Sequence, residues 1–199
     1  MGSIAGVDEA GRGPLAGPVV AAVVVLAPDQ LIEGVRDSKK LSEKQREASF
    51  IKIQSEAMAW AIGSAEVAEI DDLNILGATM LAMQRAVAGL NMRPDVLRID
   101  GNKAPDFKGD VAGVTETLVG GDDICPAIGA ASILAKVTRD RIMQQLHLSY
   151  PGYGFDRHKG YPTAVHRQAL LELGVTPEHR QSFRPVRDAL RRVTKPVNG

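Results

Sequence analysis

Acidic residues stand at the ends of two apolar runs in this sequence. Asp8 and Glu9 close the run that begins at Ser3, and Asp100 closes another and precedes a glycine. Side chains of neighbouring strand residues point to opposite faces, so Asp8 and Glu9 reach one site only if the strand ends there. Carboxylates that gather at strand ends repel one another unless a cation lies among them, and oxygen ligands suit Mg²⁺ or Mn²⁺ rather than Zn²⁺.

A third acidic pair, Asp122 and Asp123, stands where a helix is expected to begin. Either residue could simply cap that helix, as the pair at Asp8 and Glu9 could simply be solvated. Three or four carboxylates in one site can instead hold two ions about 3.5–4 Å apart, which position a water and a leaving oxygen in phosphodiester hydrolysis. The acidic residues therefore suggest a metal-dependent nuclease.

The turn from Gly11 to Gly17 is rich in glycine. It matches neither phosphate-binding template, because no Lys-Ser or Lys-Thr follows and the third glycine comes one residue late for a dinucleotide fingerprint. Its backbone amides could still approach a sugar-phosphate closely, since glycine has no side chain in the way. An ordinary turn is the alternative.

Loops elsewhere carry residues that could contact nucleic acid. Lys39 and Lys40 are adjacent lysines in a polar loop, and Tyr161 follows a basic segment where its ring could stack on a base or sugar. Solvation of the lysines and packing of the ring at the edge of the core are the alternatives. The four histidines lack a metal-ligand spacing, so His166 is interpreted as structural, and Cys125 has no neighbouring histidine to activate it.

The elements that must position these residues follow from periodicity and turn signals. The expected strands are Ser3–Asp8 and Val19–Leu26, which form a hairpin, then Met58–Ala65, Val96–Asp100 and Val111–Val119. Four helices are expected: from a capping box at Ser42 and Gln45 to about Glu56, over Asn74–Leu90, over Ile124–Leu148, and from Thr163 to Gly174. The third of them is expected to have Asp122 and Asp123 in its first turn and Ile142 facing inward. Tyr150–Pro162 is expected to be a loop, and Thr176-Pro177 to begin another short helix-like segment. Strands early and helices late predict a mixed sheet covered by helices, followed by a helical extension.

Composition limits the class of protein. A chain of 199 residues, 44% of them apolar, is long enough for one domain with a core. A single cysteine and the lack of a long apolar segment favour the cytoplasm and exclude a membrane span. The net charge is zero, yet residues 136–199 carry +7 and residues 1–135 carry −7. Either the basic part binds an acidic partner or it is a solvated pair of helices.

Several long motifs, in one order along nearly the whole chain, resemble bacterial ribonuclease HII. The segments that carry the likeness are Gly6 to Pro18, Asp37 to Leu41, Asp100 to Asn102, Ala130 to Asp140 and His158 to Tyr161. The resemblance implies an α/β fold with a ribonuclease-H-like mixed five-stranded sheet flanked by helices. It implies one catalytic domain over residues 1–199, of which about 150–199 form a helical substrate-binding extension.

The same resemblance implies an endonuclease that cuts RNA in RNA/DNA hybrids and cuts 5′ of single ribonucleotides in duplex DNA, leaving a 5′-phosphate and a 3′-hydroxyl. By position, the implied metal-binding carboxylates, for two Mg²⁺ or Mn²⁺ ions, are Asp8, Glu9, Asp100 and Asp122. The implied substrate-binding residues are Gly11, Arg12 and Gly13 for the 2′-hydroxyl, Tyr161 for the next deoxyribose, and Lys39, Lys40 and Lys136 for phosphates. The family usually has Lys-Gly-Asp-Ser where this chain has Gly120-Gly121-Asp122-Asp123, which leaves Asp123 open as the fourth ligand.

Three other functions compete with this interpretation. A binding module without catalysis would keep the basic face and need no carboxylates. The sister type-three ribonuclease H carries an extra N-terminal domain, for which Asp8 lies too near the start. An unrelated nucleotide-binding enzyme would need the missing Lys-Ser signature. A monomer with no membrane contact is expected.

Overall fold

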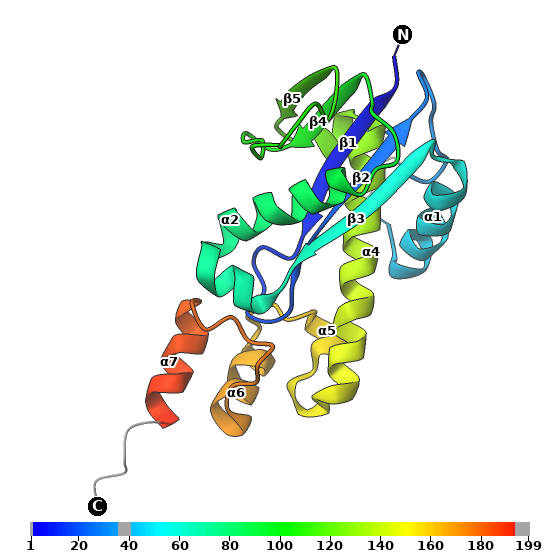
Figure 1. Ribbon diagram of the computed structural model, residues 1–199. Helices are drawn as coiled ribbons and strands as arrows, with labels where there is room; N and C mark the ends of the chain where they lie inside the picture. The colour runs from blue at the N-terminus through cyan, green and yellow to red at the C-terminus, as the bar shows by residue number, and fades with distance from the viewer. Residues whose placement is uncertain (1, 36–40, 194–199) are drawn as a thin grey trace, which may run out of the picture.

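Five strands form one mixed sheet between two layers of helices in the computed structural model, which describes residues 2–35 and 41–193 (Figure 1). The strands are β1 (Ile4–Ala10), β2 (Val19–Leu26), β3 (Ala59–Ala65), β4 (Val96–Asp100) and β5 (Val114–Leu118). Their order is β3-β2-β1-β4-β5, with β1 antiparallel to β2 and parallel to β4. This confirms the predicted five-stranded mixed sheet and its hairpin.

The helices fall into sheet-covering elements and a C-terminal group. They are α1 (Glu43–Glu56), α2 (Val67–Ala88), α3 (Gly121–Ile124), α4 (Pro126–Ser149), the 3₁₀ turn η2 (Pro151–Tyr153), α5 (Phe155–His158), α6 (Ala164–Leu173) and α7 (Arg184–Val193). Helices α5, α6 and α7 lie together beyond one end of the sheet (Figure 1). In residues 2–35 and 41–193, none of the helices combines the length and the hydrophobicity that a membrane span requires.

Each face of the sheet has its own hydrophobic cluster. Helix α2 packs on one face, while α1 and α4 pack on the other (Figure 1). All eight residues of β2 are buried, as expected for an apolar strand covered on both sides. Helix α4 crosses β1 so closely that a Cβ at Gly6 would collide with the backbone of Ala127 and Ile128. This contact fixes α4 beside the strand that carries Asp8.

Two predicted helix starts are confirmed, and the one predicted at Asn74 is wrong. The capping box at Ser42 and Gln45 opens α1, and the hydroxyl of Thr163 accepts a hydrogen bond from the His166 amide at the start of α6. Asn74, predicted to begin a helix, lies at a kink inside α2 with a φ of 62°, and its side chain accepts hydrogen bonds from the amides of Leu76 and Gly77. Asn74 thus caps the second half of a helix that begins seven residues earlier.

Other boundaries were predicted wrongly. Strand β1 continues past Asp8 to Ala10, because its pairing with β2 extends that far, and β5 is shorter than expected. Asp122 and Asp123 lie in the separate helix α3, since Pro126 begins α4 and holds the preceding Cys125 extended.

The C-terminal half also departs from prediction in places. Met143 is fully buried on α4, whereas Ile142 is only half-buried. The expected loop from Tyr150 to Pro162 contains η2 and α5, and the segment after Thr176 is a turn, with the next helix beginning at Arg184.

Candidate active site

Asp8 lies at the junction of β1, β4 and α4. The parallel pairing places Val7 opposite Ile99, so continuing this register places Asp8, two residues before the end of β1, beside Asp100 at the end of β4. The Asp8 carboxylate is almost fully buried; it accepts a hydrogen bond from the Glu9 amide at 2.7 Å and interacts with the Ser132 hydroxyl of α4. Burial, reinforced by the charges of Glu9 and Asp100, raises the pKa of Asp8 from 3.8 to about 8.

Glu9 shares this electrostatic environment from the next position of β1. Burial raises the pKa of Glu9, the Arg12 guanidinium at 3.2 Å opposes the rise, and the Asp100 charge adds to it. The strand does not end at Asp8, so the expected turn is not what allows both side chains to approach one site. Asp100, at the end of the neighbouring strand, is near enough to perturb both carboxyls.

Asp100 connects the sheet to α3. Its Oδ1 accepts a hydrogen bond from the Gly121 amide at 2.7 Å, which fixes the start of α3 against the end of β4. Asp122, the next residue, is half-buried, whereas Asp123 is exposed. Within residues 2–35 and 41–193, no three His, Cys, Asp or Glu side chains are grouped closely enough to hold one metal ion. The role of Asp122 as fourth ligand therefore stays a prediction.

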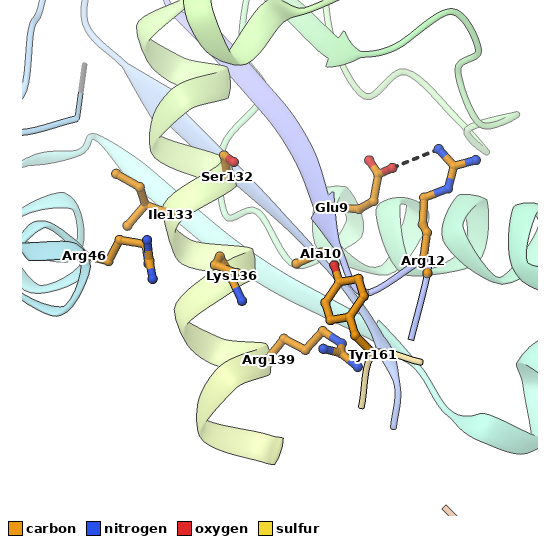
Figure 2. A pocket seen from close by; sticks show the side chains of 11 residues that line it. Glu9, Ala10, Arg12, Arg46, Ser132, Ile133, Lys136, Arg139 and Tyr161 are labelled. Atoms are coloured by element: carbon orange, nitrogen blue, oxygen red, sulfur yellow. Dashed lines mark hydrogen bonds and ion pairs between the residues drawn. The ribbon is translucent and has the colours of Figure 1, made fainter. Parts of the chain in front are cut away.

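A cavity of about 420 Å³ adjoins Glu9 (Figure 2). The turn from Gly11 to Gly13 forms one wall, α4 contributes Ser132, Lys136 and other side chains, and Tyr161 lies at the rim. Tyr161 is 45% exposed as a residue, and a Cβ added to Gly13 would lie 3.3 Å from its ring. The glycine turn and the aromatic ring, which lie far apart in the sequence, therefore meet in one site.

Gly11 is required at its position for two reasons. Its φ of +100° lies in the region that side chains rarely adopt, and a Cβ there would collide with the Arg139 side chain. The turn is therefore built around glycine, although it is no standard phosphate loop.

The lysines predicted to contact phosphates differ in where the structure places them. Lys136 lines the cavity, but its Nζ pairs with Asp140 Oδ1 at 2.6 Å. Arg46 of α1, which no sequence pattern indicated, also lines the cavity. Lys39 and Lys40 lie outside the described residues, so their predicted role is untested.

Two buried arginines are the main residues that sequence reasoning missed. The side chains of Arg139 and Arg180 are 1% and 0% exposed, and burial lowers the pKa of Arg139 to about 10 and that of Arg180 to about 9. Within the part of the chain that the structure describes, neither forms an ion pair with a carboxylate; both donate to backbone carbonyls. One signal for Arg139 was available, because it shares the apolar stripe of its helix with Ala135 and Met143.

The histidines near the site are structural, as expected for His166. The His166 ring is fully buried, with Nε2 3.0 Å from Nε2 of His179 and Nδ1 3.0 Å from the Tyr161 carbonyl. His179 Nδ1 accepts from the Thr176 amide, so a proton on Nε2 of His179 and one on Nδ1 of His166 satisfy every contact. Two neutral rings thus support the loop that carries Tyr161.

Comparison with known proteins gives one consistent result. The model of the family "Ribonuclease HII" matches residues 5–186. Ribonuclease HII of Shewanella halifaxensis is 60% identical over 190 residues, covering 96% of this chain and 92% of that protein. The crystal structure of ribonuclease H2 from Pyrococcus horikoshii aligns with a TM-score of 0.81 at 29% identity, covering 98% of this chain and all of that one. Bst-RNase HIII, whose structure was solved in complex with Mn²⁺, shares the fold at 17% identity with a TM-score of 0.76, covering 98% of this chain and 71% of that one.

Proposed function

Because the chain belongs to the ribonuclease HII family, we propose that it cuts 5′ of single ribonucleotides embedded in duplex DNA, as well as within longer RNA strands of hybrids. Family membership makes the chain a nuclease of the ribonuclease H type, which acts on RNA/DNA hybrids and needs divalent metal ions. The proposed cleavage uses two ions and leaves a 5′-phosphate and a 3′-hydroxyl.

The juxtaposition of Asp8 and Asp100 is the observation that carries this proposal. A buried carboxyl whose pKa is raised by burial and by neighbouring acids holds its proton near neutral pH unless a cation compensates its charge. The chemistry of these donors fits a divalent ion, because oxygen-only ligands suit Mg²⁺ or Mn²⁺. When bound, the ions supply a polarised water and stabilise the charge that develops on the phosphate oxygens.

The protein's own residues have distinct tasks in this proposal. Asp8, Glu9, Asp100 and Asp122 would hold the ions. The Ser132 contact and the Gly121 amide keep Asp8 and Asp100 in place, and the Arg12 pair restrains Glu9. These contacts reduce the reorganisation that binding of metal requires.

Substrate selection belongs to the cavity beside the carboxylates. The exposed backbone at Arg12 and Gly13 is suited to contact the 2′-hydroxyl, the group by which proteins distinguish RNA from DNA. The half-exposed Tyr161 ring is suited to stack on the following deoxyribose. Lys136, together with Lys39 and Lys40, would contact phosphates, and the basic C-terminal part of the chain would follow the duplex backbone.

Three accompanying predictions also belong to this proposal. The whole chain acts as one catalytic domain in which residues from about 150 contact substrate. We expect a monomer located in the cytoplasm.

The decisive experiment uses a labelled DNA duplex that contains one ribonucleotide. We expect Mg²⁺- or Mn²⁺-dependent cutting 5′ of the ribonucleotide, complete inhibition by EDTA, and loss of cutting but not of binding in Asp100→Asn. An all-DNA duplex serves as the uncut control. Binding without cutting by the native protein would favour the non-catalytic binding module, and wild-type turnover by Asp100→Asn would refute the metal assignment.

A further inference from the structure

The loop from Gly11 to Pro18 turns its carbonyl groups toward two buried guanidinium groups. All three nitrogens of the Arg180 guanidinium donate hydrogen bonds, at 2.7–3.2 Å, to the carbonyls of Gly11, Arg12, Pro14, Gly17 and Pro18. Arg139 donates at 2.9–3.0 Å to the carbonyls of Ala16, Pro18 and Lys159. Arg180 thus contacts the loop on both sides of its tip.

These contacts also orient the opposite side of the loop. In a planar trans peptide, the N–H points away from the C=O of the same unit. With the carbonyls of Gly11 and Arg12 held inward, the amides of Arg12 and Gly13 point away from Arg180. Within the described part of the chain, neither amide donates a hydrogen bond, and both residues are exposed at the cavity.

The C-terminal segment that carries Arg180 is attached to the same loop through its backbone. The Arg180 amide donates to the Leu15 carbonyl at 2.8 Å, and the Gly17 amide donates to the Glu178 carbonyl at 2.9 Å. The loop also connects to the Tyr161 segment, since the Leu15 amide donates to the Gly160 carbonyl at 2.8 Å. Arg180 therefore lies where the glycine turn, the aromatic rim and the C-terminal extension meet.

We propose that Arg180 is a positioning residue for recognition of the ribonucleotide: its guanidinium fixes the peptide planes of the glycine turn so that the amides of Arg12 and Gly13 face the sugar. This inference rests on the proposed function. Arg180 does not touch the substrate; it acts through the turn, and Arg139 supports it. The C-terminal extension then has a second function besides contact with the duplex, because it carries the Arg180 guanidinium that orients the glycine turn.

The chemistry of the contact requires arginine. A guanidinium presents five N–H donors in a planar fork, whereas a lysine ammonium presents three on a compact group. An ammonium at this position cannot reach carbonyls on both sides of the loop tip at once. Arg180→Lys is therefore expected to keep the buried charge and lose the orientation.

The test compares Arg180→Ala and Arg180→Lys with the wild type, and uses Ile53→Ala as a matched control for lost stability. Ile53 of α1 is fully buried in the hydrophobic cluster between α1, α4 and the sheet, and this cluster includes no residue of the loop from Gly11 to Pro18. At a temperature where all four proteins are folded, we expect kcat/KM on the one-ribonucleotide duplex to fall about 100-fold in Arg180→Ala, because misplaced binding groups cost about that much. Ile53→Ala is expected to stay within about threefold of the wild type, since only its stability changes.

Guanidinium chloride at about 20 mM, far below the denaturing range, gives a readout that lost stability would not produce. We expect guanidinium to occupy the space that the Arg180 side chain leaves in Arg180→Ala. It should then increase the rate of cutting about tenfold, a partial recovery of the positioning effect. It should not restore Arg180→Lys or change Ile53→Ala. The ratio of affinities for one-ribonucleotide and all-DNA duplexes, measured in EDTA, should fall toward one in both Arg180 variants.

Three results would overturn the inference: unchanged kcat/KM in both Arg180 variants, equal effects of guanidinium on Arg180→Ala and Ile53→Ala, or an unchanged affinity ratio. If Arg180→Ala does not fold, Arg180→Lys decides through kcat/KM and the affinity ratio. If the wild type cuts no ribonucleotide, the proposed function fails by itself. Amide exchange then decides the positioning claim, which requires faster exchange at Leu15 and Gly17 in Arg180→Lys than in Ile53→Ala.

Discussion

Replacement of Asp8 by asparagine should make the protein more stable in the absence of metal and inactive in its presence. Asp8→Asn preserves the shape of the side chain and removes a charge that the fold buries beside Glu9 and Asp100. The native state of the wild type must either protonate this carboxyl or accommodate its charge. Asparagine requires neither.

The magnitude follows from the raised pKa. The pKa of Asp8 rises from 3.8 to about 8 on folding. A carboxyl with a raised folded pKa contributes stability that is fully present below pH 3.8 and is lost as pH rises through about 8. At about 1.4 kcal/mol per pKa unit, the full loss is at most about 6 kcal/mol. The advantage of Asp8→Asn should therefore be near zero at pH 4 and largest at pH 9.

Urea unfolding in EDTA at pH 4, 7 and 9 measures this advantage directly. Added Mg²⁺ should narrow the difference at pH 7 to 9, by about 2.7 kcal/mol at a concentration of 100 Kd, because an ion that binds only the native carboxylate site stabilises the wild type. A free-energy difference that does not change with pH, or a variant less stable than the wild type at pH 9 in EDTA, would refute the electrostatic reasoning. Equal stabilisation of both proteins by Mg²⁺ would show that Asp8 is not a ligand of the metal ion.

Three further predictions test other parts of the site. Asp122→Asn should reduce Mg²⁺-dependent cutting at least about 100-fold, whereas the exposed Asp123→Asn should stay near wild type; the reverse order in a cleavage assay would move the fourth ligand to Asp123. Tyr161→Ala should reduce kcat/KM at a lone ribonucleotide about tenfold more than within a long RNA strand, because lost stacking costs about 1–3 kcal/mol; equal losses would make the ring structural. Burial lowers the pKa of His179 from 6.5 to about 4, so native stability should fall by up to about 3 kcal/mol as pH decreases through that range. His179→Gln should flatten this fall in acid unfolding curves, and an unchanged slope would show that the buried His166–His179 pair is not its source.

Local sequence signals were sufficient to predict an element where its structure depends only on residues close together in the chain. The capping box at Ser42 satisfies the amides at a helix start within four residues, and it was predicted correctly. The end of β1 was predicted wrongly, because only pairing with β2 determines whether the strand continues past Asp8. The helix break at Cys125 had a local cause in Pro126 that the periodicity of the long helix concealed.

The sequence by itself determined which chemical groups the site contains. The acids, the glycine turn and the tyrosine are visible as residue types at fixed spacings, and their order identifies the family. Tertiary structure alone decided which of them meet: β1 and β4 bring Asp8 to Asp100, and the C-terminal segment brings Arg180 to Gly11. The physical reason is that burial and hydrogen bonding depend on neighbours far away in the chain. Arginine is a residue type usually found at the protein surface. Only the carbonyl groups of the packed loop stabilise the buried charge of Arg180.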